Sequence, residues 1–260
     1  MSAEYLQHMF GLDGKTAVVI GGGGVLGGAL VRGLAGAGAY VVVADLDDRL
    51  CRERVAEVEA AVGKASSCLI DVTRRESLEN LLAEGKKVSG RVDILVNCAG
   101  VNHGSPFLEH SADQWDRVMA INLKAVFEAC QVFGAHMVEA GGGAIVNIGS
   151  VTSHLPLSRV FAYSASKAGV LNLTRNVADE LAVKNVRVNA ICPGFFPAEQ
   201  NRKLLGPERI DNIMRGTSMR RFGEPDELIG ALLLLVSDKA GGFITGTHVN
   251  VDGGFTAAWF

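Results

Sequence analysis

The stretch Ser150-Val-Thr-Ser-His-Leu-Pro-Leu-Ser-Arg-Val-Phe-Ala-Tyr163-Ser-Ala-Ser-Lys167 joins two segments of different periodicity. It follows a short apolar run, 144–148, that is typical of a buried β-strand. It leads into 162–181, whose apolar spacing and good helix formers predict an α-helix. The loop therefore begins at the carboxyl end of a predicted strand, which is where parallel α/β sheets bind their ligands.

Two side chains of this stretch, Tyr163 and Lys167, form the candidate chemical centre. They are four residues apart, so on a helix they lie one turn from each other on the same face. A phenol beside an ammonium is expected to have a lowered pKa, because the positive charge favours the phenolate. Tyr163 is therefore predicted to donate and accept a proton near neutral pH, and Ser150 to offer its hydroxyl to the same substrate oxygen.

The Tyr-x-x-x-Lys spacing alone is a weak signal, because it occurs by chance in many helices as a solvated pair. Its place in the chain gives it weight. It comes after a glycine-rich turn at 21–24, after a strand that ends at Asp45, and after Asn97-Cys-Ala-Gly100.

The composition is that of one α/β domain over 1–260. The 260 residues are 48% hydrophobic, which suffices for one large core, and no linker or repeat divides them. The net charge of −3, without a basic block, argues against nucleic acid or a membrane surface as partner. The five cysteines are scattered and form no metal-ligand pattern, so reduced thiols and no metal are expected. Residues 1–10 do not resemble a signal peptide and the longest apolar run, 231–236, is too short for a membrane span, so we expect a cytoplasmic protein.

Predicted strands and helices alternate along the whole chain. The strands are expected at 15–20, 39–44, 65–70, 93–96, 144–148, 186–191 and 248–251. The helices are expected at 25–37, 48–62 (with Val55, Val58 and Val62 on its apolar side), 74–88, 112–139, 162–181 and 225–237, with an irregular helical excursion at 199–215 interrupted by Pro207. This alternation predicts a doubly wound parallel sheet, the Rossmann fold, with about seven strands and helices on both faces.

The glycine-rich turn after the first strand is a candidate dinucleotide site. Glycines let the backbone approach a pyrophosphate, and the helix behind them presents free N–H groups. A glycine turn alone could be only a tight connection, but the order of strand, turn and helix favours nucleotide binding. The predicted contacts are Gly21, Gly24, Val25 and Leu26.

Asp45 is placed to accept hydrogen bonds from a ribose diol. It could instead cap the next helix, although Asp47 or Asp48 can do that equally well. Its carboxylate would repel a 2′-phosphate, and neither Leu46 nor Asp47 supplies a positive charge. The sequence therefore favours NAD over NADP.

Three further positions have both a structural and a functional interpretation. Asp71, followed by Val72, could cap the next helix, as could Thr73, or could bind the adenine. The backbone of Asn97, Ala99 and Gly100 is expected beside the adenine ribose. Asn122 is a poor helix former in mid-helix, and is either a satisfied core residue or a bend that holds a water linked to Lys167.

Taken together, the motifs resemble the short-chain dehydrogenase/reductase family along nearly the whole chain. The resemblance rests on the turn 21–27, Asp71-Val72, 97–100, Asn122, Ser150, Tyr163-x-x-x-Lys167 and Pro193-Gly194. It implies a catalytic tetrad in which Tyr163 is the acid/base, Ser150 orients the carbonyl or alcohol, Lys167 lowers the tyrosine pKa and binds the nicotinamide ribose, and Asn122 supports a water relay. It also implies cofactor contacts from Tyr163, Lys167, Pro193 and Phe196, hydride transfer at C4 of the nicotinamide, and a homotetramer.

The sequence departs from the family pattern at two places. The family's turn reads T-G-x-x-x-G-x-G, and here Ile20 replaces the Thr and Val25 the middle Gly. After Pro193-Gly194 the family offers a Thr hydroxyl to the carboxamide, and Ala198 stands there. Both departures concern the cofactor more than the fold.

A narrower resemblance, to the D-mannonate (fructuronate) oxidoreductase branch, rests on 21–27, 193–196 and Glu199-Gln-Asn-Arg202. Gln200 and Arg202 could bind the carboxylate and hydroxyls of a sugar acid, or could simply begin an exposed helix. His154 and Asn102-His103 could line the same pocket, although loop histidines are more often solvated. The segment 195–219 is expected to form the substrate lid.

Three functions are therefore weighed. The first is an NAD-dependent oxidoreductase of carbohydrate metabolism that interconverts a secondary alcohol and a ketone on a sugar acid or polyol. The second is a 3-oxoacyl-thioester reductase, which would favour NADPH and a basic surface, against Asp45 and the acidic net charge. The third is a nucleotide-sensing regulator without catalysis, which need not keep Ser150, Tyr163 and Lys167 together.

Overall fold

A single seven-stranded parallel sheet organises the computed structural model, in which residues 2–196 and 206–257 are described. Its strand order is β3-β2-β1-β4-β5-β6-β7. Successive strands are therefore added on one side of β1 up to β3, and on its other side from β4 onward. All six pairings are parallel. The strands are β1 (Thr16–Ile20), β2 (Tyr40–Asp45), β3 (Lys64–Leu69), β4 (Ile94–Asn97), β5 (Gly143–Ile148), β6 (Val186–Pro193) and β7 (His248–Val251). The predicted doubly wound Rossmann sheet is confirmed.

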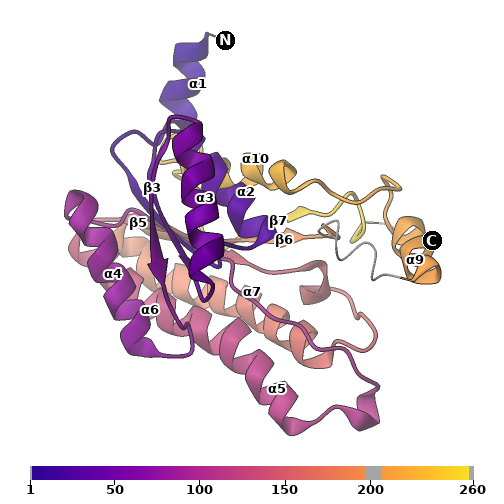
Figure 1. The fold of residues 1–260 in the computed structure, drawn as a ribbon. Coiled ribbons are helices and arrows are strands. Elements are labelled where there is room, and N and C mark those ends of the chain that lie inside the picture. Colours follow the sequence, from indigo (N-terminus) through magenta and orange to yellow (C-terminus); the bar gives the residue numbers. More distant parts are fainter. Residues whose placement is uncertain (1, 197–205, 258–260) are drawn as a thin grey trace.

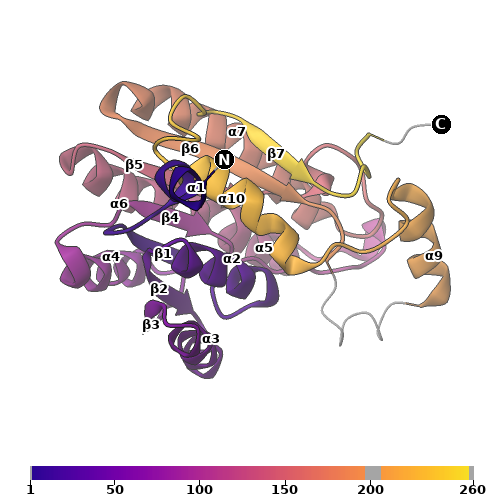
Figure 2. The same ribbon diagram turned by 90° about the horizontal axis from the view of Figure 1, so that it is seen from above.

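Helices cover both faces of the sheet (Figure 1). One layer holds α2 (Val25–Gly36), α3 (Asp48–Ala60) and α10 (Ile229–Val236), which lie on the near side in Figure 2. The other layer holds α4 (Arg75–Ser89), α5 (Ala112–Met119), α6 (Ala125–Glu139) and α7 (Phe161–Leu181). Each layer has its own apolar core, because alternate residues of the central strands point to opposite faces. Strand β1, at the centre, is therefore buried at every residue.

Helices α5 and α6 are one continuous helix joined by a π-helical segment, Ala120–Lys124. The stretch 112–139 is long and apolar enough to cross a membrane by composition alone. Half of its apolar 18-residue window is buried within the fold, and Val126, Phe133 and Met137 belong to the apolar core between the sheet and the layer of α4 to α7. It is therefore a core helix of this domain.

Two local expectations were wrong, and one helix had not been considered. Pro207 does not interrupt a helix but begins one, α9 (Pro207–Gly216), where its missing N–H costs nothing. Val62 is not on the apolar side of α3, because that helix ends at Ala60; Val62 lies beyond it with φ 62° and is 91% exposed. Residues 3–10, where no element was expected, form the exposed helix α1 (Ala3–Phe10), capped by the Ser2 hydroxyl.

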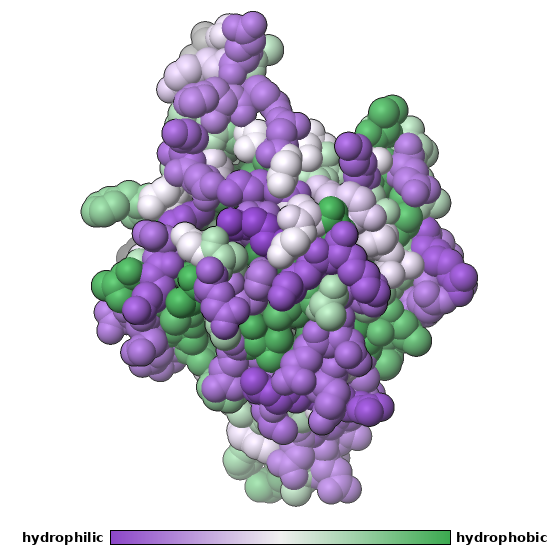
Figure 3. Space-filling model, turned by 90° about the vertical axis from the view of Figure 1, so that its left-hand side faces the viewer, coloured by the Kyte–Doolittle hydropathy of each residue, from purple (hydrophilic) through white to green (hydrophobic). Residues whose placement is uncertain are grey.

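Charged side chains at the amino-terminal edge of the sheet are paired with one another. Lys15 lies 2.7 Å from Asp238, and Arg91 lies 2.7 Å from Asp93. The face on the left of Figure 1 is accordingly mostly hydrophilic (Figure 3). The groups that could bind a ligand or take part in a reaction lie at the opposite, carboxyl edge.

Candidate active site

The glycine turn after β1 is packed too closely for side chains. Gly21 has φ 81°, and a Cβ on it would lie 2.5 Å from the backbone nitrogen of Ala99. A Cβ on Gly27 would lie 2.0 Å from the carbonyl oxygen of Gly21. Helix α2 begins directly behind the turn with Gly24 as N-cap, which has no side chain to satisfy the first N–H groups. Those N–H groups therefore face the carboxyl edge of the sheet, ready for an anion.

Asp45 lies beside this turn. Its Oδ2 accepts a hydrogen bond from the Gly23 N–H at 3.1 Å, and its Oδ1 accepts one from Leu46 N–H at 2.7 Å. The cap of α3 is Asp47, which accepts from the N–H groups of Arg49 and Leu50. Asp45 is thus not the helix cap, and it holds a negative charge next to the glycine turn.

Asp71 and Asn97 are both held by local contacts. Asp71 accepts hydrogen bonds from the Thr73 N–H (2.9 Å) and hydroxyl (2.7 Å), which lower its pKa. The N-cap of α4 is Arg74, so neither proposed capping role is fulfilled. The Asn97 amide points into the core and donates to Asn147 Oδ1 at 2.8 Å. Only the backbone of Asn97 is available at the edge of the sheet, as expected for the turn 97–100.

Asn122 lies in the π-helical segment and is fully buried. Its Oδ1 accepts from Val101 N–H at 2.8 Å, while its Nδ2 donates to Val101 O at 2.9 Å and to Ser166 Oγ at 3.2 Å. The predicted irregularity of this helix is confirmed. The side chain joins the turn after β4 to helix α7, and Val101 is a partner that the sequence did not indicate.

Ser150, Tyr163 and Lys167 come together at the carboxyl end of β5. Ser150 and Lys167 are 7% and 4% exposed, and the Ser150 side chain is near enough to the Tyr163 phenol to lower its pKa. The Lys167 Nζ lies 5.7 Å from the centroid of the Tyr163 ring and donates to the carbonyl oxygen of Ile148 at 2.7 Å. Tyr163 thus has a hydroxyl on one side and an ammonium on the other, as the spacing predicted.

The expected direction of the Tyr163 pKa was wrong. Burial raises the pKa of this phenol, and the nearby Ser150 side chain opposes the rise only in part. Burial also lowers the pKa of Lys167, to about 8. Helical spacing identifies the neighbours of Tyr163 but not the loss of water around it, which is the larger effect here.

The two replaced positions of the glycine turn differ in their exposure. Ile20 is 3% exposed and belongs to the core, whereas Val25, the first residue of α2, is 49% exposed where the turn opens.

Pro193 ends β6 and is buried. Phe196 packs so tightly on Gly223 that a Cβ there would lie 2.2 Å from its ring. A cavity of about 250 Å³ lies beside it, lined partly by Phe195, Thr217 and Met219.

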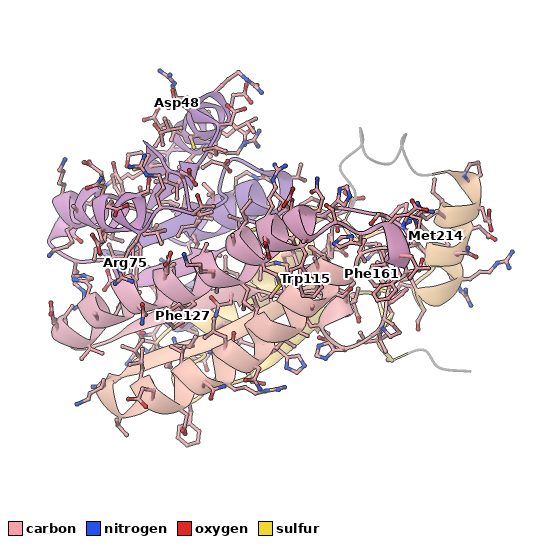
Figure 4. All side chains as sticks on the ribbon, turned by 90° about the horizontal axis from the view of Figure 1, so that it is seen from below. Asp48, Arg75, Trp115, Phe127, Phe161 and Met214 are labelled. Carbon is pink, nitrogen blue, oxygen red and sulfur yellow. The ribbon has the colours of Figure 1, made fainter. Side chains whose placement is uncertain are left out.

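The candidate substrate residues are less well brought together. His154 stacks on His248, with ring centroids 4.6 Å apart, at the start of β7. His103 lies 5.7 Å from His110, which in turn contacts Phe161. Gln200 and Arg202, and also Ala198, lie outside the described residues. Figure 4 shows Met214, on α9 of the expected lid, at the same end of the molecule as Phe161, where α7 begins.

The residues at this edge fit a dinucleotide. Gly100 lies against Asn122 and Lys167, since a Cβ on it would be 3.5 Å from Asn122 Oδ1 and 3.6 Å from Lys167 Nζ. The same edge presents the N-terminus of α2 to a pyrophosphate and the Asp45 carboxylate to a ribose. The positions suited to a pyrophosphate, to a ribose and to acid/base chemistry therefore lie along a single edge of the sheet.

Comparisons with known proteins place the chain among oxidoreductases. The family model described as "Enoyl-(Acyl carrier protein) reductase" matches residues 24–256. "Uncharacterized oxidoreductase UxuB" of Bacillus subtilis (strain 168) is 39% identical and covers 95% of this chain and 96% of its own length. An "NAD-dependent glycerol dehydrogenase" of Listeria innocua is 36% identical and covers 98% of this chain and 99% of its own.

Solved structures agree with this placement. A gluconate 5-dehydrogenase from Burkholderia cenocepacia, in complex with NADP and tartrate, superimposes with a TM-score of 0.92 at 33% identity, covering 98% of this chain and 100% of that one. A short-chain type dehydrogenase/reductase from Mycobacterium marinum has a TM-score of 0.90 at 30% identity, covering 99% and 100%. The chain belongs to the short-chain dehydrogenase/reductase family and is a nicotinamide-dependent oxidoreductase acting on CH–OH groups.

Proposed function

We propose that this enzyme is an NAD-dependent dehydrogenase that interconverts a secondary alcohol and a ketone on a polyol or sugar acid. The observation that carries the proposal is the grouping of Ser150, Tyr163 and Lys167 at the carboxyl edge of the sheet, beside the glycine turn. A bound nicotinamide supplies the acceptor or donor of the hydride.

Ser150 is placed to donate a hydrogen bond to the substrate. Its Oγ accepts a hydrogen bond from the Thr152 N–H at 3.2 Å, which leaves the O–H free to point at the substrate oxygen. Tyr163 takes the proton from the alcohol during oxidation and returns it during reduction. This geometry supports the catalytic roles proposed for both.

Lys167 acts through its charge. With a pKa of about 8 it is mostly protonated at neutral pH, and the ammonium 5.7 Å from the ring centroid stabilises a phenolate when one forms. Asn122 holds Val101, and therefore Gly100, beside this ammonium. The water relay through Asn122 stays a prediction.

The substrate class is supported by the relatives rather than by a substrate pocket. The Listeria innocua relative is named for glycerol, and the Burkholderia cenocepacia neighbour is a gluconate dehydrogenase with tartrate bound. All three molecules are polyhydroxylated, and gluconate and tartrate carry carboxylates. Within this class we propose a sugar acid such as D-mannonate, with Gln200 and Arg202 as its binding residues.

NAD is the proposed cofactor because of Asp45. Its carboxylate lies against Gly23 and would repel a 2′-phosphate. The relatives differ on this point, since the Listeria innocua protein is named NAD-dependent and the Burkholderia cenocepacia structure contains NADP.

A substrate panel tests the proposal. The protein is mixed with NAD⁺ or NADP⁺ and with aldonic acids, polyols and simple alcohols, and the reduced cofactor is followed by absorbance. Preferred turnover of an aldonate or polyol with NAD⁺ supports the proposal. Turnover of a 3-oxoacyl thioester with NADPH alone, the reaction for which a Thermotoga maritima relative is named, would replace it; tight NAD binding without turnover would favour a regulator.

We also propose a homotetramer. Trp115 on α5 and Phe127 on α6, both labelled in Figure 4, are 39% and 43% exposed. Phe127, Leu123 and Leu173 also line a hollow of about 650 Å³. Exposed apolar side chains that lie together are typical of a contact between subunits. Size-exclusion chromatography with light scattering gives the subunit number.

A further inference from the structure

Ser153 links the two halves of the acid/base centre. Its Oγ accepts a hydrogen bond from the Ser150 N–H at 3.2 Å and donates one to the carbonyl oxygen of Lys167 at 2.9 Å. Ser150 belongs to the turn after β5, and Lys167 to helix α7. One hydroxyl therefore fixes the distance between the turn that carries Ser150 and the helix that carries Tyr163 and Lys167.

The turn itself is closed around this hydroxyl. Ser150 and Ser153 form a capping box on the short 3₁₀ segment Val151–Ser153: the Ser150 side chain accepts the Thr152 N–H, and the Ser153 side chain accepts the N–H of Ser150, the N-cap. Gly149 leaves the room: a Cβ there would lie 2.8 Å from Cys192 Sγ and 3.3 Å from Ser153 Oγ. The position of Ser150 is thus determined by Ser153 and by close packing on β6.

We infer that Ser153 is a positioning residue for the reaction, acting through Ser150. This inference rests on the proposed role of Ser150. Proton transfer and hydride transfer need the reacting atoms in a narrow range of geometry, and a displacement of about 1 Å can reduce the rate on the order of 100-fold. Loss of the Ser153 hydroxyl frees the turn from α7, so that Ser150 no longer points at the oxygen that Tyr163 serves.

A double-mutant cycle tests this. Ser153→Ala, Ser150→Ala and the double variant are assayed with the best substrate of the panel for kcat, KM, dinucleotide Kd and Tm. We expect Ser153→Ala to lower kcat on the order of 10- to 100-fold with the Kd of the dinucleotide unchanged. In the Ser150→Ala background the same change should lower kcat less than about 3-fold, because residues that act as a unit are not additive.

Ser237→Ala is the matched control. The Ser237 side chain is also buried, and it also bridges two segments by donating to Met9 O and accepting from Ala240 N–H, at the end of α10. It should lower Tm and leave kcat unchanged. Should Ser153→Ala not fold, Ser153→Cys, which keeps the shape and weakens both hydrogen bonds, takes its place in the cycle.

The outcomes are distinct. An unchanged kcat for Ser153→Ala, or an equal loss in both backgrounds, overturns the positioning role while leaving the proposed function intact. An unchanged kcat for Ser150→Ala overturns the proposed role of Ser150 itself.

Discussion

The connections β1–α2 and β5–α7 have the same layout but use different chemistry. In β1–α2 the turn consists of glycines, and the available groups are backbone N–H groups and the space that Gly21 and Gly27 leave. In β5–α7 the turn is longer and the available groups are side chains, those of Ser150, Tyr163 and Lys167. One connection is suited to bind an anion by its backbone, and the other to move a proton by buried side chains. Substitutions in the two should therefore fail in different ways.

The largest effect is expected in the second connection. Tyr163→Phe should lower kcat on the order of 10²- to 10⁴-fold, the usual contribution of a general acid/base, with dinucleotide binding retained. Steady-state kinetics and a cofactor titration measure both. Tyr40→Phe, at the amino-terminal edge of the sheet, is the matched control and should change neither. Retained turnover in Tyr163→Phe would remove this residue as the proton carrier.

Lys167 should leave a signature in the pH dependence of stability. Burial lowers its pKa from 10.5 to about 8, so between these values the unfolded chain binds the proton and the folded one does not. The unfolded state then binds more protons, and the free energy of unfolding rises with pH through this range, by up to about 3 kcal/mol. Urea unfolding of the wild type and of Lys167→Met from pH 7.5 to 10.5 shows it as a difference between the two curves.

The buried thiols oppose this trend. Burial raises the pKa of Cys98 to about 11, so its contribution to stability falls as the pH rises above 9. Both proteins carry Cys98, so its effect largely cancels in the difference. A constant difference between the two curves would contradict the burial of an ionisable lysine.

The first connection should respond to volume instead. Gly27→Ala places a Cβ 2.0 Å from the Gly21 carbonyl, so the turn must shift, and we expect a loss of about 1–3 kcal/mol in unfolding free energy together with weaker dinucleotide binding. Gly36→Ala, in the same helix, is the control, because a Cβ there meets no atom of the described residues within 4 Å. It should stabilise the protein by about 0.5–1 kcal/mol. Equal effects at the two glycines would contradict the close packing of the turn.

The smallest effect concerns the choice of cofactor. Asp45→Asn keeps an oxygen for the Gly23 N–H and removes the charge, so the preference for NAD over NADP should fall by about 10-fold, or 1.4 kcal/mol. Titration with both dinucleotides gives the ratio. Asp47→Asn, at the cap of α3, should leave it unchanged. An unaltered ratio in Asp45→Asn would show that this carboxylate does not face the ribose.

Local patterns predicted most of the fold. The strand at 248–251 has the predicted bounds, and the other six lie within two residues of them, because most are apolar runs ended by a glycine, proline or polar turn. The four residues of the tetrad were found by spacing and by resemblance. Their proximity in space follows from the rule that the carboxyl ends of parallel strands share one edge.

What could not be predicted depends on distant parts of the chain. The raised pKa of Tyr163 comes from burial by surrounding elements, and the sequence shows only its helical neighbours. The Asn97 amide turns inward because Asn147, fifty residues later, accepts its hydrogen bond. Ser153 had a local signal, the S-x-x-S spacing of a capping box, but its bond to Lys167 crosses to another element.

The π-helical turn at Ala120–Lys124 sets the rotational phase of everything that follows it. One residue more than an α-helix needs turns the second half by about 100° relative to the first. Deleting any one residue between 120 and 124 would relax the bulge into regular helix at little cost in backbone hydrogen bonds. It would also swing Asn122 away from Val101 or rotate Phe133 out of the core, so this helix should tolerate exchanges of side chain far better than changes of length.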